Sequence, residues 1–494
     1  MGQVNLLYGD GAWSFGVPDD AVVVDDIPAG QVRQPLQDPV AALREALAQP
    51  LGMEPLERLV DKDSRVAITV NDWMGGSYYA APVVLEILRS RGVKDQNIRI
   101  MIAGGTHAKV TRRQLFVSNM GRWKAPKGGP YLEAFRILPP EIIDAWSRPG
   151  DERIERHDAA DPESLVSFGP SAAGDLVEVN KILLEADVVV HLGWGPVPLS
   201  PWGGFVGGGM LGLTSARSIL GHHSPAAINH REGTHGDPEH QVYSRHKIAL
   251  MEKIEENVTS KFFLIDPYFN ARGQFAGRWW AGHWRKLRDA QVSYAMEEFK
   301  VKVNGSSADV VLLDCPPWMF HGATSSPLLA MSHVASTLRG YLPPNPVLRK
   351  GGVVICATPC DGTIDDWYRP SDREAMSLYA KVGRDIDELF DRYSEDFLNR
   401  PEYIYKYRVC YGHHPIHAFW LLAAEQYVFD QSSQVIFAGA KDSEPLRQMG
   451  IIPAPDLKTA WKMATATLAK KHPDVTVLSN CPKRFGLTFD IAKG

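Results

Sequence analysis

Short, nearly continuous runs of apolar residues recur along the chain, and each is followed by a segment with helical periodicity. The runs are Val66–Val70, Ile98–Ala103, Val188–His191, Phe262–Ile265, Val310–Leu313, Val353–Ala357 and Val435–Ala438. Runs of this length are typical of parallel strands that are buried on both faces. Their alternation with helical segments predicts an α/β protein whose sheets are mostly parallel and flanked by helices.

A break near residues 295–308 divides this pattern in two. Asn304-Gly305-Ser306-Ser307 provides turn-forming residues between an amphipathic segment and the next strand. A chain of 494 residues also exceeds the size of one ordinary core. We therefore expect two α/β domains, residues 1–298 and 299–494, and the final residues can return to the first domain. Residues 363–415, rich in Asp, Arg and Tyr, are expected to form a helical excursion on the second domain.

The amino-acid composition of the chain limits which kinds of molecule can be its main binding partner. Hydrophobic residues make up 44% of the chain and charged residues 22%, and the net charge is -5. This balance is typical of a globular protein and argues against nucleic acid or an anionic membrane as the main partner. The five cysteines form no CxxC pair, and no apolar stretch reaches the roughly 18 residues of a membrane span. With no signal peptide at the N-terminus, a cytoplasmic protein is expected.

The first candidate site lies where the Val66–Val70 strand ends. Asp72 follows this strand, Gly75 and Gly76 permit a tight turn, and a helix is expected over Val83–Arg91. A carboxylate at this edge can orient a substrate hydroxyl or a histidine. An Asp in this position is also typical of a helix cap or turn, and the sequence leaves both interpretations open.

The second candidate site follows the Ile98–Ala103 strand. Gly104 and Gly105 lead into His107, and Thr111 with Gln114 forms a capping box that starts a helix. A histidine at the edge of a sheet can take the proton of a substrate hydroxyl near neutral pH. A structural histidine would satisfy the same pattern.

Glycines and histidines crowd the segment after the Val188–His191 strand. The loop Gly203–Gly212 contains the spacing Gly207-x-Gly209-x-x-Gly212, but it does not directly follow a strand, as a nicotinamide-dinucleotide fingerprint requires. Gly207 and Gly208 can still let a nucleotide or substrate approach the backbone. Neutral imidazoles ligate nickel or zinc, so the histidines that follow are candidate metal ligands: His222, His223, His230, His235, His240 and His246.

Taken together, these segments resemble the nickel-pincer lactate racemase family, and the resemblance spans most of the chain. The matching motifs are Leu7-Tyr8-Gly9, the turn at Asp72, Gly105-Thr106-His107, His157-Asp158, Asn180-Lys181, Glu185-Ala186-Asp187, Gly203–Gly212, His222-His223, Phe275-Ala276-Gly277, Ala281-Gly282-His283, Gly351-Gly352 and Asp361-Gly362.

The resemblance implies a two-step inversion of a 2-hydroxy acid. A nickel held in a pincer ring on a nucleotide accepts the substrate's α-hydride, histidines move the hydroxyl proton, and hydride returns to either face of a planar keto acid. Carried over to this chain, Asp72 is the acid of the turn, His107 the first acid/base and His223 the nickel ligand. The glycines at 75, 76, 104, 105, 207 and 208 are the candidate cofactor-binding positions.

Several family positions have changed. Gly75 stands where the family has Arg, and the second acid/base histidine falls near Pro198, where only Ser200 is polar. The lysine that tethers the pincer would lie within Phe205–Gly208, which contains no lysine, so a non-covalent cofactor is expected. A later family lysine aligns with Arg339, a candidate catalytic residue that keeps the charge but not the geometry. The second base would then be another group, with His321 and His333 as candidates.

The leading hypothesis is a racemase or epimerase of a 2-hydroxy acid, including a sugar acid, with a non-covalent nickel-pincer nucleotide. One alternative is a divergent relative that binds a metabolite without turnover. Another is an NAD-dependent 2-hydroxy acid oxidoreductase built on Gly207–Gly212. We expect the two domains to meet at a site containing Asp72, His107 and His223, because ligands bind beyond the carboxyl ends of parallel strands. The sequence leaves the oligomeric state open.

Overall fold

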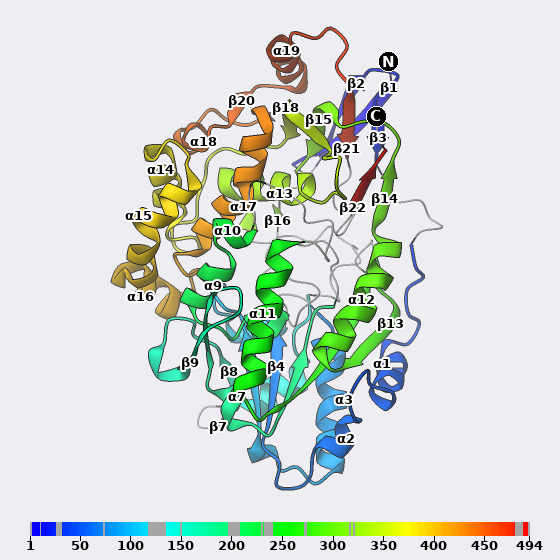
Figure 1. Cartoon of the computed structure of the whole chain (residues 1–494), viewed down its shortest axis with the longest axis vertical. Coiled ribbons are helices and arrows are strands. Elements are labelled where there is room, and N and C mark those ends of the chain that lie inside the picture. The colour runs from blue at the N-terminus through cyan, green and yellow to red at the C-terminus, as the bar shows by residue number, and fades with distance from the viewer. Residues whose placement is uncertain are drawn as a thin grey trace.

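The computed structural model describes most of the chain. The described residues are 2–9, 11–25, 32–72, 75–116, 135–148, 151–195, 208–228, 231, 241–270, 274–315, 318–319, 322–479 and 488–492. Two α/β sheets, one in each half of the molecule, dominate these residues (Figure 1). This architecture confirms the predicted fold class.

The first sheet has the strand order β13-β12-β11-β4-β5-β8. Its strands are β4 (Val66–Asn71), β5 (Ile98–Ala103), β8 (Ile154–Arg156), β11 (Val188–Leu192), β12 (Lys261–Phe269) and β13 (Phe275–Gly282). All neighbours are parallel except β12 and β13. Side chains alternate between two cores: Ile68 faces one with the helices α1 (Pro39–Ala48) and α3 (Ser77–Ser90), whereas Ala67 faces the other with α11 (Val242–Asn257) and α12 (Trp284–Glu298).

The second sheet is parallel throughout and has the order β20-β19-β18-β15-β21-β3. Its strands are β3 (Val22–Val24), β15 (Ala308–Asp314), β18 (Leu348–Ala357), β19 (Ser432–Ala438), β20 (Ile452–Ala454) and β21 (Val475–Leu478). One face packs on α13 (Pro327–Leu338) and α17 (His417–Gln431), and the other on α19 (Leu457–Leu468) and the hairpin of β1 (Gly2–Tyr8) and β2 (Gly11–Val17).

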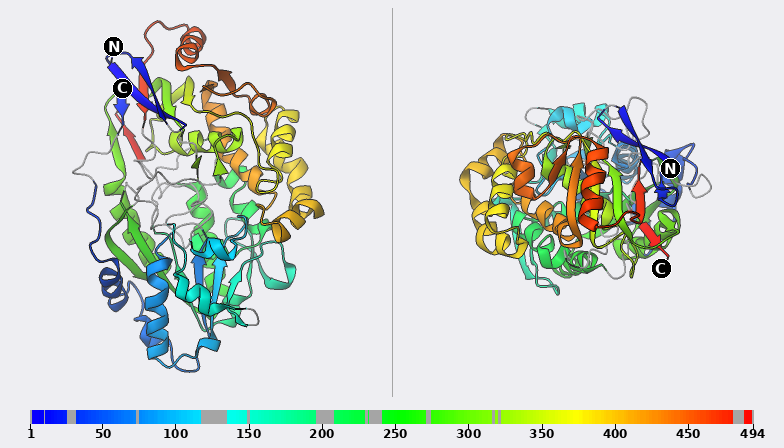
Figure 2. Two further views of the ribbon diagram at one scale, coloured as in Figure 1. Left: turned by 180° about the vertical axis from the view of Figure 1, so that it is seen from behind. Right: turned by 90° about the horizontal axis from the view of Figure 1, so that it is seen from above.

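Every strand predicted from an apolar run is present, because burial on both faces makes such runs nearly continuous. The expected division at residue 298 needs one correction. The N-terminal hairpin and β3 belong with the second sheet, since β3 pairs with β21 and the hairpin packs beside β15. In the view from behind, the blue N-terminal hairpin lies in the same half of the molecule as the red C-terminal elements (Figure 2).

The expected helical excursion is also present, as α14 (Asp372–Lys381), α15 (Ile386–Asn399) and α16 (Pro401–Val409). The remaining helices are α2 (Leu56–Leu59), α4 (Arg112–Phe116), α6 (Pro140–Trp146), α7 (Ile182–Glu185), α8 (Gly208–Leu211), α9 (Ala216–His222), α10 (Pro225–Ile228) and α18 (Glu444–Met449). Short paired strands complete the described structure: β6 (Ser147–Arg148) with β7 (Asp151–Glu152), β9 (Leu165–Pro170) with β10 (Leu176–Asn180), β14 (Lys300–Val303) with β22 (Thr488–Ile491), and β16 (Trp318–Met319) with β17 (Gly322–Ala323).

Candidate active site

The turns after β4 and β5 bring Asp72 and His107 together. The two strands are parallel neighbours that end in register, Asn71 opposite Ala103, so the residues that follow share one edge of the sheet. The Oδ2 atom of Asp72 lies 3.0 Å from Nδ1 of His107. Asp72 is buried and His107 is partly exposed. The carboxylate accepts the Nδ1 proton, which leaves Nε2 as the proton-accepting nitrogen of a neutral imidazole.

The local structure after β5 follows the predicted capping box. The backbone N–H of Thr111 donates to the Gln114 side chain over 2.6 Å, and the Gln114 N–H donates to the Thr111 hydroxyl over 3.3 Å. The helix α4 therefore begins directly after Thr111 and contains Gln114, and the segment between β5 and α4 is a short turn that carries His107. His107 is not itself the helix cap.

The second domain contributes histidines to the same place, and the sequence analysis did not identify them. His413 and His417 lie in the loop between α16 and α17 and at the start of α17. The His107 ring centroid is 6.0 Å from that of His413 and 5.5 Å from that of His417, and the latter two are 4.5 Å apart. The available signal was the sequence His413-His414-Pro415-Ile416-His417. Its first three residues belong to the segment 363–415, which was predicted only as a helical excursion.

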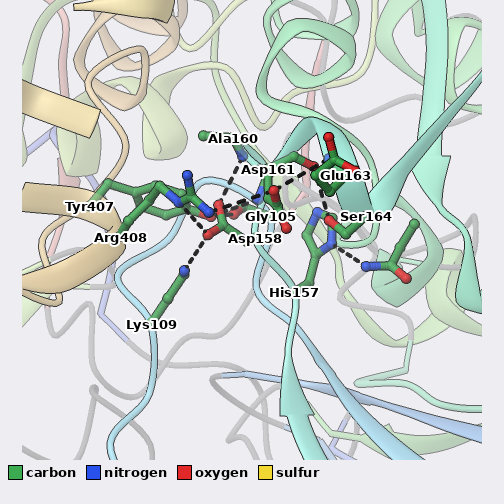
Figure 3. Close-up of polar contacts among 12 residues, drawn as sticks. Gly105, Lys109, His157, Asp158, Ala160, Asp161, Glu163, Ser164, Tyr407 and Arg408 are labelled. Carbon is green, nitrogen blue, oxygen red and sulfur yellow. Dashed lines mark hydrogen bonds and ion pairs between the residues drawn. The ribbon is translucent and has the colours of Figure 1, made fainter. Parts of the chain in front are cut away.

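Polar contacts fasten the second domain to the turn after β5 (Figure 3). The Tyr407 hydroxyl donates to the Gly105 carbonyl oxygen over 2.8 Å. The Asp158 carboxylate accepts from Lys109 of the first domain over 2.7 Å and from Arg408 of α16 over 2.9 Å. The domain interface is therefore defined by buried and half-buried hydrogen bonds directly beside His107.

His222 and His223 end the helix α9, which begins at the N-cap Ser215. His223 Nδ1 lies 3.0 Å from the Ile219 carbonyl oxygen, and its Nε2 lies 2.5 Å from the Tyr243 hydroxyl. His222 is fully buried, and both of its ring nitrogens lack a hydrogen-bond partner among the described residues. Burial, with the nearby charge of Lys247, lowers the pKa of His222 to about 3. Burial, with His222 and Lys247, also holds the pKa of His223 well below its usual value. Both imidazoles are therefore neutral, the form that ligates metals.

A chain of ring contacts joins the His107 and His223 groups. The His417 ring lies 5.5 Å from His107 and 4.1 Å from Trp420, and Trp420 lies 5.2 Å from His223. The proximity of His107 also contributes to the low pKa of His223. The structure thus gathers Asp72, His107 and His223 at one region of the domain interface.

Three of the predicted cofactor-binding glycines, Gly75, Gly76 and Gly105, have packing or backbone roles in the described structure. A Cβ on Gly76 would lie 2.1 Å from the Trp279 ring, and one on Gly75 would lie 2.6 Å from the Gly193 carbonyl oxygen. Gly105 has a φ of +52° and donates its N–H to Gly212 over 2.8 Å. A Cβ on Gly104 would meet nothing closer than the Asp72 side chain, at 3.6 Å.

Other predicted positions lie elsewhere. Gly208 begins α8, whereas Gly207 and His321 lie outside the described residues. Arg339 is completely buried and donates to the carbonyl oxygens of Ala424 and Ile228, so the structure gives it a structural rather than a catalytic role. His333 is likewise buried, with Nε2 2.9 Å from the Asp314 carbonyl oxygen.

One further group at the carboxyl edge was not predicted. Asp266 follows the last parallel pair of β12, and burial raises the pKa of its carboxyl to about 6. Gln291 donates to this carboxyl over 2.9 Å. The sequence signal for this residue was a single polar position after the apolar residues Leu264 and Ile265.

Comparison with known proteins relates this chain to lactate racemases. The family model described as lactate racemase N-terminal domain matches residues 8–118 and 136–235. These two segments of the chain therefore resemble a lactate racemase N-terminal domain. The chain is 22% identical over 479 residues to the lactate racemase of Thermoanaerobacterium thermosaccharolyticum, with 94% of each chain covered. It is 26% identical over 248 residues to the lactate racemase of Lactiplantibacillus plantarum, covering 49% of this chain and 51% of that one.

Solved structures extend the likeness to the whole fold. The lactate racemase apoprotein from Thermoanaerobacterium thermosaccharolyticum matches with a TM-score of 0.67 at 18% identity, covering 99% of this chain and all of that one. A structural-genomics protein from Thermotoga maritima matches with a TM-score of 0.51 at 13% identity, covering 92% of this chain and 99% of that one. The two-domain α/β fold is therefore that of a lactate racemase. Across the described residues, no helix is long and apolar enough to cross a bilayer.

Proposed function

We propose that this protein is a racemase or epimerase of a small 2-hydroxy acid. The observation that carries the proposal is the Asp72–His107 pair at the carboxyl edge of the first sheet, in a chain whose residues 8–118 and 136–235 match the lactate racemase N-terminal domain. Ligands of open α/β sheets bind at this edge. A cytoplasmic location, as the sequence suggests, would give such an enzyme access to small metabolic acids.

In this proposal His107 is the first acid/base. Its Nε2 takes the proton of the substrate hydroxyl as the α-hydrogen leaves with its electron pair, and a planar keto acid remains. Asp72 holds the ring by its Nδ1–H and stabilises the imidazolium that forms. Return of the hydrogen to the other face inverts the centre, because the planar carbonyl carbon is no longer stereogenic and can accept hydrogen on either face.

The residues present fit the nickel-pincer nucleotide that the family resemblance implies. His222 is buried and His223 is partly buried, and both imidazoles are neutral. The His222 ring nitrogens have no hydrogen-bond partner among the described residues, and a neutral imidazole is a donor that nickel binds. His223 is the proposed ligand, and it would exchange its contact with Tyr243 for the metal. When bound, this group supplies a two-electron acceptor for the α-hydride.

A single protein imidazole is sufficient if the pincer ring supplies the other donors. This agrees with the finding that no group of three or more His, Cys, Asp or Glu residues in the described part of the chain is placed to hold a metal alone. Because the loop Gly203–Gly212 contains no lysine, we propose that the nucleotide is held without a covalent bond.

The test is to produce the protein together with the enzymes that make the pincer cofactor. The D and L forms of lactate, malate and glycerate are then supplied separately, and the enantiomers are resolved by chiral chromatography. Racemisation of one of these acids in proportion to bound nickel supports the proposal. Nickel-loaded protein that binds but never inverts any of them would favour the divergent binding protein, and reduction of added NAD would favour the dehydrogenase.

The role of His107 is tested by His107→Asn. We expect turnover per bound nickel to fall by about 10²–10⁴, the usual contribution of a positioned acid/base. Nickel content should remain unchanged, because the proposed ligand is His223, and His223→Ala is the matched variant that should lose nickel. If His107→Asn folds, binds nickel and turns over within a few-fold of the parent, His107 is not the base.

A further inference from the structure

Three histidine rings from the two domains meet beside the proposed active site. His107 comes from the turn after β5, whereas His413 and His417 come from the second domain, and both of the latter are buried. The ring centroids form a triangle with sides of 6.0, 5.5 and 4.5 Å. Groups at these separations can contact the same small molecule.

The hydrogen bonds of His413 fix its tautomer. Its Nδ1 lies 3.1 Å from the carbonyl oxygen of Tyr368, which also accepts the His413 backbone N–H over 2.9 Å. A carbonyl oxygen only accepts, so Nδ1 carries the proton and Nε2 carries the lone pair in the neutral ring. His413 therefore has the same tautomer as His107, whose Nδ1 donates to Asp72.

His417 has the opposite tautomer. Its Nδ1 lies 2.8 Å from Nη1 of Arg369, and a guanidinium only donates hydrogen bonds. The proton of the neutral His417 ring is therefore on Nε2, which makes this nitrogen a hydrogen-bond donor. Asp372 fixes the guanidinium in turn, over 2.8 Å, and both members of this ion pair are buried. Arg369 is thus a positioning residue that acts through His417.

The approach of these histidines to His107 is set by the backbone. The His414 N–H donates to the Thr106 carbonyl oxygen over 2.9 Å, next to His107 in the chain. Tyr407 binds the Gly105 carbonyl oxygen on the other side of the same turn. Two direct bonds between the domains therefore flank the histidine triangle, and its geometry does not depend on flexible surface side chains.

We propose that His413 is the second proton-transfer residue of the racemisation and that His417 donates a hydrogen bond to a substrate oxygen. This inference rests on the proposed function. A racemase needs a base for the hydroxyl of each enantiomer, and in the family resemblance the second acid/base histidine falls near Pro198, where only Ser200 is polar. His107 and His413 belong to different domains and have the same proton-accepting Nε2, so they can serve opposite enantiomers in one site.

The proposed step is balanced in the same way for both bases. The O–H bond of the substrate breaks and its proton passes to Nε2 of His413. The C–H bond breaks with its electron pair passing to the hydride acceptor of the proposed function, and the carbonyl double bond of the keto acid forms. In reverse, the imidazolium of His413 returns the proton to the carbonyl oxygen as the carbon regains its hydride.

The decisive experiment measures the oxidation half-reaction, because the overall racemisation rate must fall equally in both directions. The nickel-loaded enzyme is mixed in excess with D-lactate or L-lactate, quenched with acid within one turnover, and assayed for pyruvate. We expect His413→Gln to slow pyruvate formation from one enantiomer by about 10²–10⁴ and from the other by less than about tenfold. His107→Asn should show the complementary preference. If the parent enzyme racemises malate or glycerate instead of lactate, that acid is used as the substrate and its keto acid is assayed in place of pyruvate.

If His413→Gln slows keto-acid formation equally from both enantiomers, the substitution has damaged the loop. If it slows neither, His413 takes no part in proton transfer. Either result overturns the assignment of His413. Tyr411→Phe, at an exposed position of the same loop, is the matched control and should leave both half-reactions within a few-fold. A parent enzyme that forms no keto acid from any of the three acids would instead refute the proposed function, and the role of His413 with it.

A second measurement does not need the cofactor. Long-range ¹H–¹⁵N spectra of the apoprotein labelled in histidine distinguish the two neutral tautomers. We expect the proton on Nδ1 in His107 and His413 and on Nε2 in His417, and we expect Arg369→Lys to change the His417 signal selectively. Oxamate, a mimic of the keto acid, should shift all three signals. A proton on Nε2 of His413 would overturn the proposal.

Discussion

Neutral histidines buried in the folded protein should make the apoprotein unusually sensitive to mild acid. His157, His191 and His414 are at most 2% exposed. Burial lowers the pKa of His157 and of His191 to about 4 and that of His414 to about 3. In the unfolded chain each imidazole has a pKa of about 6.5. These histidines therefore contribute stability that is present above about pH 6.5 and is lost as the pH falls toward their folded pKa values.

The magnitude follows from proton uptake. At about pH 5 the unfolded chain binds nearly three more protons at these sites than the folded chain does, so the free energy of unfolding changes by roughly 4 kcal/mol per pH unit. Between about pH 7 and about pH 5 the accumulated loss is roughly 5–6 kcal/mol. Asp266 acts in the opposite direction. Its pKa is raised to about 6, so its contribution grows on acidification and offsets about 1.3 kcal/mol of the loss.

The net loss of about 4 kcal/mol is a large part of the 5–15 kcal/mol that stabilises a typical domain. Urea unfolding of the apoprotein, followed by fluorescence and circular dichroism across this pH range, measures it. His157→Gln keeps a donor for the Thr214 carbonyl oxygen, now bonded by Nε2 over 2.9 Å. It should flatten the dependence by about 1.4 kcal/mol per pH unit. His472→Gln, at an exposed position, is the control and should not. An unchanged slope in His157→Gln, or a parent whose stability is flat down to about pH 5, would refute the reasoning.

Two further outcomes are expected. Gly76→Ala should lower the free energy of unfolding in urea by about 1–3 kcal/mol, because the new Cβ would overlap the Trp279 ring. Gly11→Ala is the control and should not, because its Cβ would have no neighbour closer than 3.9 Å. Equal stabilities of the two variants would contradict the packing role of Gly76. Intact-mass measurement of the denatured holoenzyme should give the mass of the chain alone. A surviving adduct of cofactor mass would contradict the non-covalent proposal, and the buried Lys247 would then be the first attachment point to test.

The sequence was most informative where one local signal decides a structure. Strands buried on both faces leave apolar runs, so β4 and β5 could be located, and their parallel order then places Asp72 beside His107. The reciprocal bonds of Thr111 and Gln114 likewise need only three residues of spacing.

What could not be predicted depends on contacts between distant segments. The three residues of β3 carry no signal that they pair with β21, more than four hundred residues later. The need for Gly76 appears only when Trp279 packs on it. The resemblance predicted Arg339 at the position of a family lysine, yet its side chain lies in the core between α10 and α17 and donates to carbonyl oxygens there.

The same dependence on distant contacts explains how a site can change while its fold is retained. His107 is held by its own domain through Asp72, whereas His413 and His417 are held by Tyr368 and Arg369 of the other. Neither domain contains both halves of the histidine triangle, so the site forms only when the domains dock. A histidine lost from one side can then be replaced from the other without altering either sheet, because the replacement needs only a loop near the interface and the backbone bonds that anchor it. The proposed role of His413 would be such an exchange, because the resemblance predicts the family's second histidine near Pro198.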